Sequence, residues 1–206
     1  MRGEIIMIKN HNRKFKLGMH SYTLHLSGFG ESWGFQEYGE HHSFEQVATF
    51  KDLVDIAVEV GLDVLHITLV DIQNDTSDAH LAECRKVAEE AGIELELNVS
   101  FNAPSDPRVN CTVEESLHIA HKLGCNLVKY STDVEHPEKS SHSCLAPSVM
   151  TQLIDIYNQF EAQIGLIEEY GMKIAIENHC DLFADEVIWL VEKLNHPLIG
   201  ACCDTI

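Results

Sequence analysis

The sequence predicts an α/β protein in which strands and helices alternate as in a (β/α)8 barrel, here truncated after the sixth strand. Six strand-like segments alternate with five helical segments along 206 residues, and no hairpin signal joins two strands. A barrel typically needs about 250 residues, so the last two units are missing. An open six-stranded sheet is the alternative. The segment 94–99 favours the barrel, because polar and apolar residues alternate in it, whereas strands of a doubly wound sheet are nearly continuously apolar.

Local signals define each element in turn. The predicted strands cover residues 16–24, 63–70, 93–101, 126–131, 174–176 and 198–206. The predicted helices cover residues 43–61, 78–92, 112–124, 148–171 and 184–195. Four of these helices end at a glycine, and the fifth stops before a proline, as helix C-termini often do.

Two helix starts carry recognisable caps. Ser43 is a plausible N-cap for the first helix, whose apolar positions, Val47 and Val60 among them, recur at helical spacing. Thr112 is followed three residues later by Glu115, which is a capping-box pattern. Both patterns support helices between the predicted strands.

Composition limits the classes of partner. Acidic residues number 33 and basic residues 14, which gives a formal net charge of −19. Such a field repels nucleic acids and anionic membranes and suits a metal cation. The seven cysteines show no C-x-x-C spacing and are predicted to be reduced thiols. With no signal peptide or membrane-length apolar stretch, we expect a soluble cytoplasmic protein, with residues 1–15 as a flexible leader and 16–206 as the barrel domain.

The stretch KIAIENHCDLF, residues 173–183, places a carboxylate directly after a short apolar strand. Alternation puts Glu177 on the inner face with Ala175. At the end of the next predicted strand, Asp204 shares a face with Cys202 and Gly200. Two neighbouring carboxylates need a cation or a shared proton, and a divalent metal prefers such oxygen ligands. The sequence therefore predicts a metal site at this end of the barrel.

The segments IAIENH and FADEVIWLVEKLNHPLIGACCDT resemble the xylose isomerase-like TIM-barrel superfamily, the sugar phosphate isomerase/epimerase family. The resemblance implies one divalent metal held by four side chains, at the ends of strands five to eight. Glu177 and Asp204 match the first two ligands, and the other two are expected beyond Ile206. Mn or Mg is preferred from ligand hardness, with Co and Zn as alternatives.

The resemblance also implies a reaction. A sugar or sugar acid would be isomerised or epimerised by proton transfer through an enediolate, with Glu177 as metal ligand and general base and Asp204 as ligand only. A lyase, decarboxylase or deglycosidase acting on a keto-sugar is an alternative within the same superfamily. A DNA-repair endonuclease is a further alternative within the superfamily, but the net charge of −19 argues against it. A non-catalytic partner subunit is the alternative if the chain ends at Ile206. The expected partner is a small carbohydrate, with no nucleic acid and no membrane, and relatives suggest a homo-oligomer.

Five further residues are candidate substrate contacts. His179 follows Glu177 and could touch substrate or orient it, or be an exposed or capping histidine. His20 could line the mouth or be a hydrogen-bonded core histidine, and His66 stands where relatives often carry glutamate. Lys129 could meet an anionic or keto substrate, although with no known partner a snorkelling lysine is the simpler interpretation. Trp33, in the long aromatic and glycine-rich loop 23–42, could contact a sugar ring from a lid or pack in the loop.

Overall fold

Six parallel strands form one curved sheet whose order follows the chain, β1-β2-β3-β4-β5-β6. The computed structural model describes residues 15–30, 45–136, 147–179 and 181–205. The strands are β1 Gly18–His20, β2 Val64–Ile67, β3 Glu94–Ser100, β4 Leu127–Ser131, β5 Lys173–Glu177 and β6 Ile199–Cys202. This sequential parallel order confirms the predicted α/β fold, a TIM barrel truncated after strand six.

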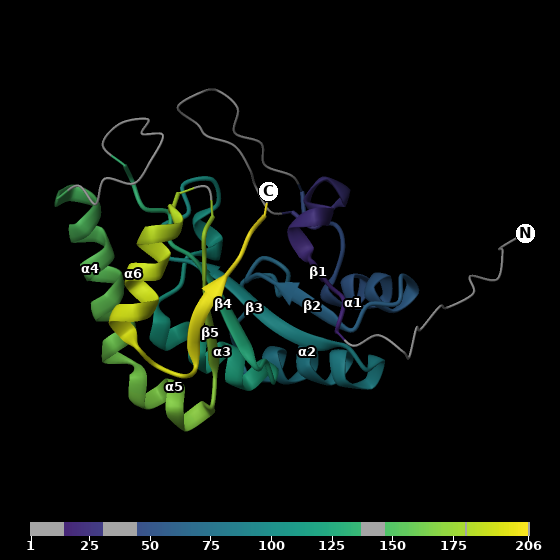
Figure 1. The fold of residues 1–206 in the computed structure, drawn as a ribbon. Coiled ribbons are helices and arrows are strands. Elements are labelled where there is room, and N and C mark those ends of the chain that lie inside the picture. The colour runs from purple at the N-terminus through teal and green to yellow at the C-terminus, as the bar shows by residue number, and fades with distance from the viewer. Residues whose placement is uncertain (1–14, 31–44, 137–146, 180, 206) are drawn as a thin grey trace, which may run out of the picture.

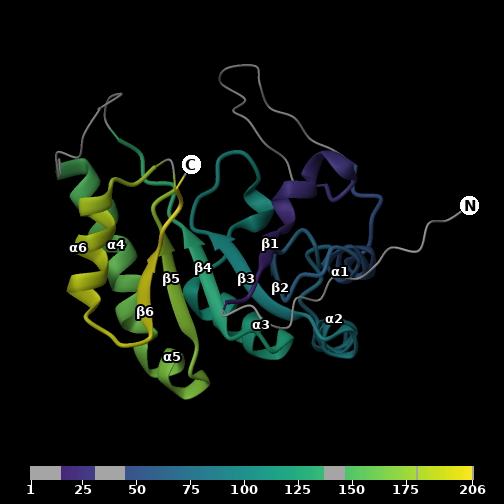
Figure 2. The ribbon, with the colours of Figure 1, turned by 45° about the vertical axis from the view of Figure 1, so that its right-hand side comes forward.

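The helices follow the outer side of the sheet, from α1 at one end to α4 and α6 at the other (Figures 1 and 2). They are α1 Phe50–Glu59, α2 Asp78–Ala91, α3 Val113–Leu123, α4 Pro147–Ala162, α5 Ile164–Tyr170 and α6 Ala184–Leu194, with 3-10 helices η1 Ser21–Ser27 and η3 Pro107–Val109. Neighbouring helices pack on one another, α1 on α2, α2 on α3 and α4 on α6. No described helix is both long and apolar enough to cross a membrane.

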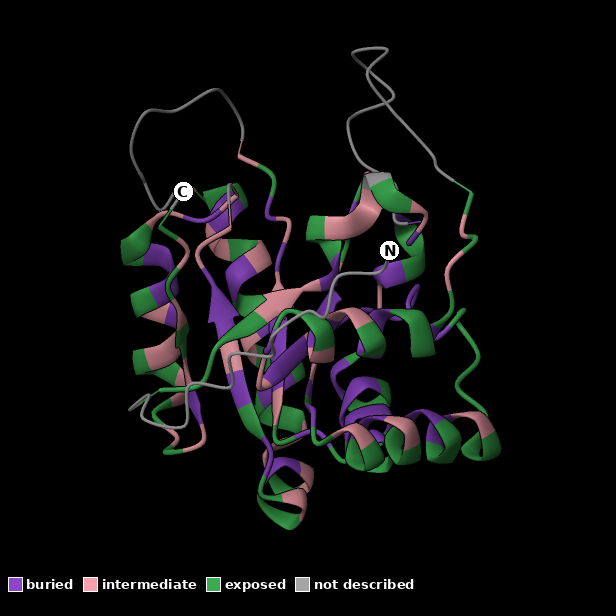
Figure 3. Ribbon diagram, turned by 90° about the vertical axis from the view of Figure 1, so that its right-hand side faces the viewer, coloured by how far each residue is buried: buried purple, intermediate pink, exposed green. Residues whose placement is uncertain are grey.

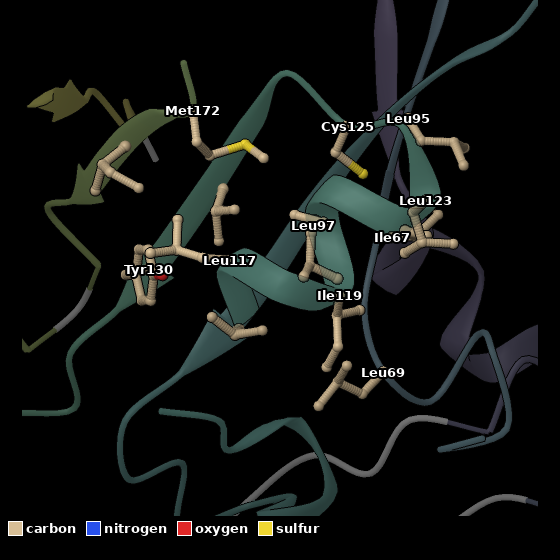
Figure 4. Packing of buried hydrophobic residues seen from close by; sticks show 14 of the residues in the cluster. Ile67, Leu69, Leu95, Leu97, Leu117, Ile119, Leu123, Cys125, Tyr130 and Met172 are labelled. Carbon is tan, nitrogen blue, oxygen red and sulfur yellow. The ribbon is translucent and has the colours of Figure 1, made fainter. Parts of the chain in front are cut away.

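Strand alternation separates an apolar outer face from a polar inner face. Apolar strand residues that are buried against the helices occur at every second position and pair with one another across the sheet: Leu65, Ile67, Leu95, Leu97, Val99, Val128, Tyr130, Ile174, Ile176 and Ile199. Figure 3 shows buried residues in the strands, and both buried and exposed residues around the helices. Leu117, Ile119 and Leu123 of α3 pack beside this layer (Figure 4). The intervening positions, which include Glu96, Asn98, Lys129, Ala175 and Glu177, face inward.

Two helix predictions were wrong in their extent. The first helix begins at Phe50 and not near Ser43, because Thr49 and Asp52 form a capping box there. Val47 and Val60 lie outside it and are exposed, whereas both were expected on its apolar face. The predicted long helix 148–171 is two helices, because the backbone of Gln163 leaves helical geometry at φ −110° and ψ 10°. Ser43 lies outside the described residues.

The first two strands are shorter than the sequence suggests. Strand β1 ends at His20, whose Nδ1 accepts a hydrogen bond of 3.0 Å from the Tyr22 amide and caps η1. Strand β2 ends at Ile67, because the Asp71 carboxylate accepts a 2.7 Å hydrogen bond from the Thr68 amide and closes a turn. Side chain to backbone bonds of this kind compete with strand pairing. Both turns therefore begin at the carboxyl ends of their strands.

Asp71 makes stability depend on pH in a defined direction. It is only 3% exposed, and burial raises its pKa from 3.8 to about 6, against hydrogen bonds from Thr68 that lower it. The folded state then binds more protons than the unfolded state between these values, so its stability falls as pH rises through that window. We expect wild type to lose about 2 kcal/mol of unfolding free energy relative to Asp71→Asn between pH 4 and pH 7, measured by urea unfolding.

The control is Asp155→Asn, on the exposed side of α4. Its pH dependence should run parallel to that of wild type. If Asp71→Asn also ran parallel to wild type, Asp71 would not be titrating in this window.

Candidate active site

The inner face at the end of β4 and β5 contains a buried ion pair. The Lys129 Nζ atom lies 2.6 Å from Oε2 of Glu177, and only 8% and 9% of the two side chains are exposed. Ser131 Oγ donates a hydrogen bond of 3.1 Å to the same oxygen. Strand register explains the meeting, because Lys129 lies opposite Ala175, two residues before Glu177. The snorkelling interpretation of Lys129 was wrong, since this lysine is buried and has a partner.

Asp204 is placed beside the end of β5 by the residue that follows Glu177. The Asn178 side chain accepts a 2.6 Å hydrogen bond from the Asp204 amide and donates one of 3.0 Å to its carbonyl. The Asn178 amide itself donates to Cys202, at 3.3 Å. This two-sided bond joins the carboxyl ends of β5 and β6. These bonds bring the main chain of Asp204 to strand β5, which carries Glu177.

His179 lies near a second carboxylate, that of Asp181. Its Nδ1 is 3.5 Å from Oδ1 of Asp181, and its side chain is 41% exposed. Oδ2 of Asp181 accepts hydrogen bonds from Thr132 Oγ1, at 2.6 Å, and from the Val134 amide, at 2.8 Å. Burial raises the pKa of Asp181, but bonds from His179, Thr132 and Val134 outweigh it and hold this pKa below the usual value. Asp181 thus ties the loop after β4 to the loop after β5.

Asp133 is a third acidic residue at the mouth of the sheet, the region around the carboxyl ends of the strands. Asp133 accepts a hydrogen bond from Ser100 Oγ. Burial raises the pKa of Asp133, the bond from Ser100 lowers it, and the charges of Asp181 and Glu177 raise it further. These carboxylates are therefore close enough to repel one another, and a cation placed among them would be favoured.

The inner face beside Lys129 contains two uncharged imidazoles. The rings of His20 and His66 lie 4.9 Å apart between centroids. Burial, and then the charge of Lys129, lowers the pKa of His66 to about 3. Burial, and then His66, lowers the pKa of His20 well below its usual value. Nε2 of His66 and Oδ1 of Asn98 are buried and have no hydrogen-bond partner among the described residues.

The structure thus brings together Glu177, Lys129 and the end of β6, and it places His20 and His66 on the same inner face. Trp33 lies outside the described residues. A separate pocket of about 340 Å³ is lined by residues of α2 and α3 such as Leu81 and His118. It lies in the outer helical layer and has no residue in common with the strand-end site.

Sequence reasoning missed Ser131, Asn178 and Asp181 as site residues. Asn178 and Asp181 stand in the quoted KIAIENHCDLF stretch, so an acid four residues after Glu177 was visible. Its role was not visible, because its partners come from the loop after β4. Ser131 closes the predicted strand 126–131, but its contact with Glu177 depends on the β4 to β5 register.

The donor set suits a divalent ion in part. Glu177 ends β5, and the main chain of Asp204, two residues after the end of β6, is bonded to Asn178; carboxylates of both residues are hard oxygen ligands. Lys129 and Ser131 both contact the Oε2 oxygen of Glu177. No group of three or more His, Cys, Asp or Glu side chains with ligand geometry occurs in that part of the chain. The two carboxylates therefore fit part of a metal site.

Replacing Asp181 with alanine should destabilise the protein by about 1–3 kcal/mol, because the Thr132 hydroxyl and the Val134 amide lose their acceptor. Asp181→Asn keeps an acceptor oxygen and should lose less. The measurement is urea unfolding at pH 7.

Asp155→Ala, an exposed change on α4, provides the reference and should remain within about 0.5 kcal/mol of wild type. Equal stabilities of Asp181→Ala and Asp155→Ala would show that the two loops do not depend on Asp181.

Several solved structures share this fold. D-psicose 3-epimerase, crystallised in the presence of D-fructose, has a TM-score of 0.61 and 19% identity over 93% of this chain and 64% of its own. The probable 3-DHS dehydratase from Bacillus anthracis has a TM-score of 0.60 and 13% identity over 92% of this chain and 63% of its own. A 3-keto-D-glucoside 4-epimerase from E. coli has a TM-score of 0.53 and 10% identity over 76% of this chain and 63% of its own.

At these identities the likeness is one of fold, and this chain spans less than two thirds of the length of each of these relatives. No curated protein sequence matches at a significant level. Residues 54–206, which are most of the chain, match the family described as xylose isomerase-like TIM barrel. The order of the parallel strands and the outer layer of helices agree with that match. The chain therefore belongs to the xylose isomerase-like TIM barrel family.

Proposed function

We propose that this protein is a divalent-metal-dependent isomerase or epimerase that acts on a sugar or sugar acid by proton transfer. The observation that carries the proposal is the Glu177 carboxylate, which is buried on the inner face at the carboxyl end of β5. Active sites of (β/α)8 enzymes lie at this end of the strands. Membership of the family supports the same class of chemistry.

Glu177 and Asp204 would hold the metal ion, for which Mn or Mg is preferred because both ligands are carboxylates. When bound, this ion would polarise the substrate carbonyl and lower the cost of an enediolate. Glu177 would remove the proton from the carbon next to that carbonyl, because its carboxylate lies on the inner face at the carboxyl end of β5. Asn178 would keep Asp204 beside β5 through its paired backbone bonds.

The surrounding groups suit a hydroxylated small molecule. His20 and His66 are uncharged at neutral pH, because burial lowers the pKa of both. A neutral imidazole both donates and accepts hydrogen bonds, which matches sugar hydroxyl groups. His179, partly exposed and held near Asp181, stands at the mouth where it could contact the substrate. The net charge of −19 disfavours a nucleic acid substrate.

A lyase acting on a keto-sugar or related acid is the second candidate, because one protein of similar fold is described as a probable dehydratase. The two classes share the removal of a proton next to a carbonyl and differ in the fate of the resulting enediolate. Product analysis by NMR distinguishes them, since an isomerase gives a product of unchanged mass and a dehydratase releases water.

Glu177→Gln should lower turnover by about 10²–10⁴-fold, the usual contribution of a general base. The amide has nearly the shape of the carboxylate but cannot accept the proton. With free keto-sugars and keto-acids as candidate substrates, in Mn²⁺ and D₂O, the measurement is incorporation of solvent deuterium at carbon by NMR. This readout follows proton transfer whichever product forms.

Asp155→Asn, at an exposed position of α4, should exchange deuterium at the wild-type rate. Exchange that continues unchanged in Glu177→Gln would exclude Glu177 as the base. Asp133 and Asp181, at the carboxyl ends of the strands, would then be the next candidates for the base.

A further inference from the structure

Lys129 and Glu177 form a pair that is isolated from water. Their charged atoms are 2.6 Å apart, and less than a tenth of either side chain is exposed. Lys129 lies between Asn98 of β3 and Ala175 of β5 in the strand register, so its neighbours on both sides are uncharged. Glu177 is thus the anion that compensates this ammonium group. Removing either partner would leave the other charge buried and uncompensated.

The same carboxylate is the proposed metal ligand. The Lys129 ammonium group and the divalent ion would therefore compete for it. The ammonium group and Ser131 both contact the Oε2 oxygen of this carboxylate. A divalent ion held by the same carboxylate would therefore lie within a few ångströms of a fixed positive charge. Repulsion over such a distance is strong where water is excluded.

We propose that Lys129 is the resident cation of this site, which compensates Glu177 when no divalent ion is bound and weakens the binding of that ion. The inference rests on the proposed metal dependence. Lys129 acts as a positioning residue, because its ammonium group holds one oxygen of Glu177 in place. Fixing the carboxylate in advance favours metal binding, but this gain is smaller than the repulsion between the charges, so the net effect is weaker binding.

The test is the affinity of the metal-free protein for Mn²⁺, measured by isothermal titration calorimetry on wild type and Lys129→Met. Methionine keeps the length and apolar body of lysine and removes the charge. We expect Lys129→Met to bind Mn²⁺ at least about tenfold more tightly than wild type. Lys129→Arg keeps the charge and should return the affinity toward that of wild type. Lys173→Met, at an exposed lysine of β5, is the matched control and should leave the affinity unchanged.

Thermal unfolding gives a second readout. Without metal, Lys129→Met should melt at a lower temperature than wild type, because Glu177 loses its counter-ion, and Mn²⁺ should raise its melting temperature by more than that of wild type. If Lys129→Met does not fold without metal, refolding it in Mn²⁺ should recover the folded protein. Failure of that recovery would contradict the proposal.

The outcomes separate this inference from the proposed function. Equal or weaker Mn²⁺ binding by Lys129→Met, with wild-type binding that Glu177→Gln abolishes, would overturn the role of Lys129 alone. Identical Mn²⁺ affinities of wild type and Glu177→Gln would overturn the metal role of Glu177 and this inference with it. Absence of Mn²⁺ binding in wild type and Lys129→Met would overturn both.

Discussion

The strict alternation of side chains along parallel strands in register is the constraint on which the other features depend. It sends the apolar strand residues, such as Leu97 and Ile176, to the helices and the polar ones to the inner face. Fully burying such a residue contributes about 1.5–3 kcal/mol. A shift of one residue would expose that apolar layer and press Lys129 and Glu177 against the helices. The outer core therefore determines which polar groups meet on the inner face.

The meeting of Lys129 and Glu177 is a consequence of that register and contributes little stability on its own. Removing two charges from water costs several kcal/mol for each ion, which their attraction offsets only with good geometry. A pair at 2.6 Å, with Ser131 as a further donor, meets this condition. Apolar residues of the same size would satisfy the core at least as well. A functional role of the two charges at the strand ends therefore explains the pair better than a contribution to folding stability does.

The loops at the carboxyl ends of β4, β5 and β6 are linked by side chains that accept or donate backbone hydrogen bonds. Asp181 holds the loop after β4 through Thr132 and Val134, and Asn178 holds the residues after β6 through Asp204. Each link replaces bonds that irregular backbone would otherwise make to water. Ligand placement at a barrel mouth requires rigid supports of this kind, because small displacements of catalytic groups reduce rates strongly.

The sequence by itself determined the order of elements, the α/β class and the inward direction of Glu177, because strand and helix periodicities and terminal glycines are local properties. It located the capping box at Thr112 for the same reason. The start of the first helix was predicted incorrectly, because Thr49 and Asp52 form the cap and not Ser43. The prediction also joined α4 to α5 across Gln163. Only the tertiary structure decided that Lys129 is the partner of Glu177 and that Asp181 serves another loop. Such contacts depend on the register between strands distant in sequence, which no local pattern encodes.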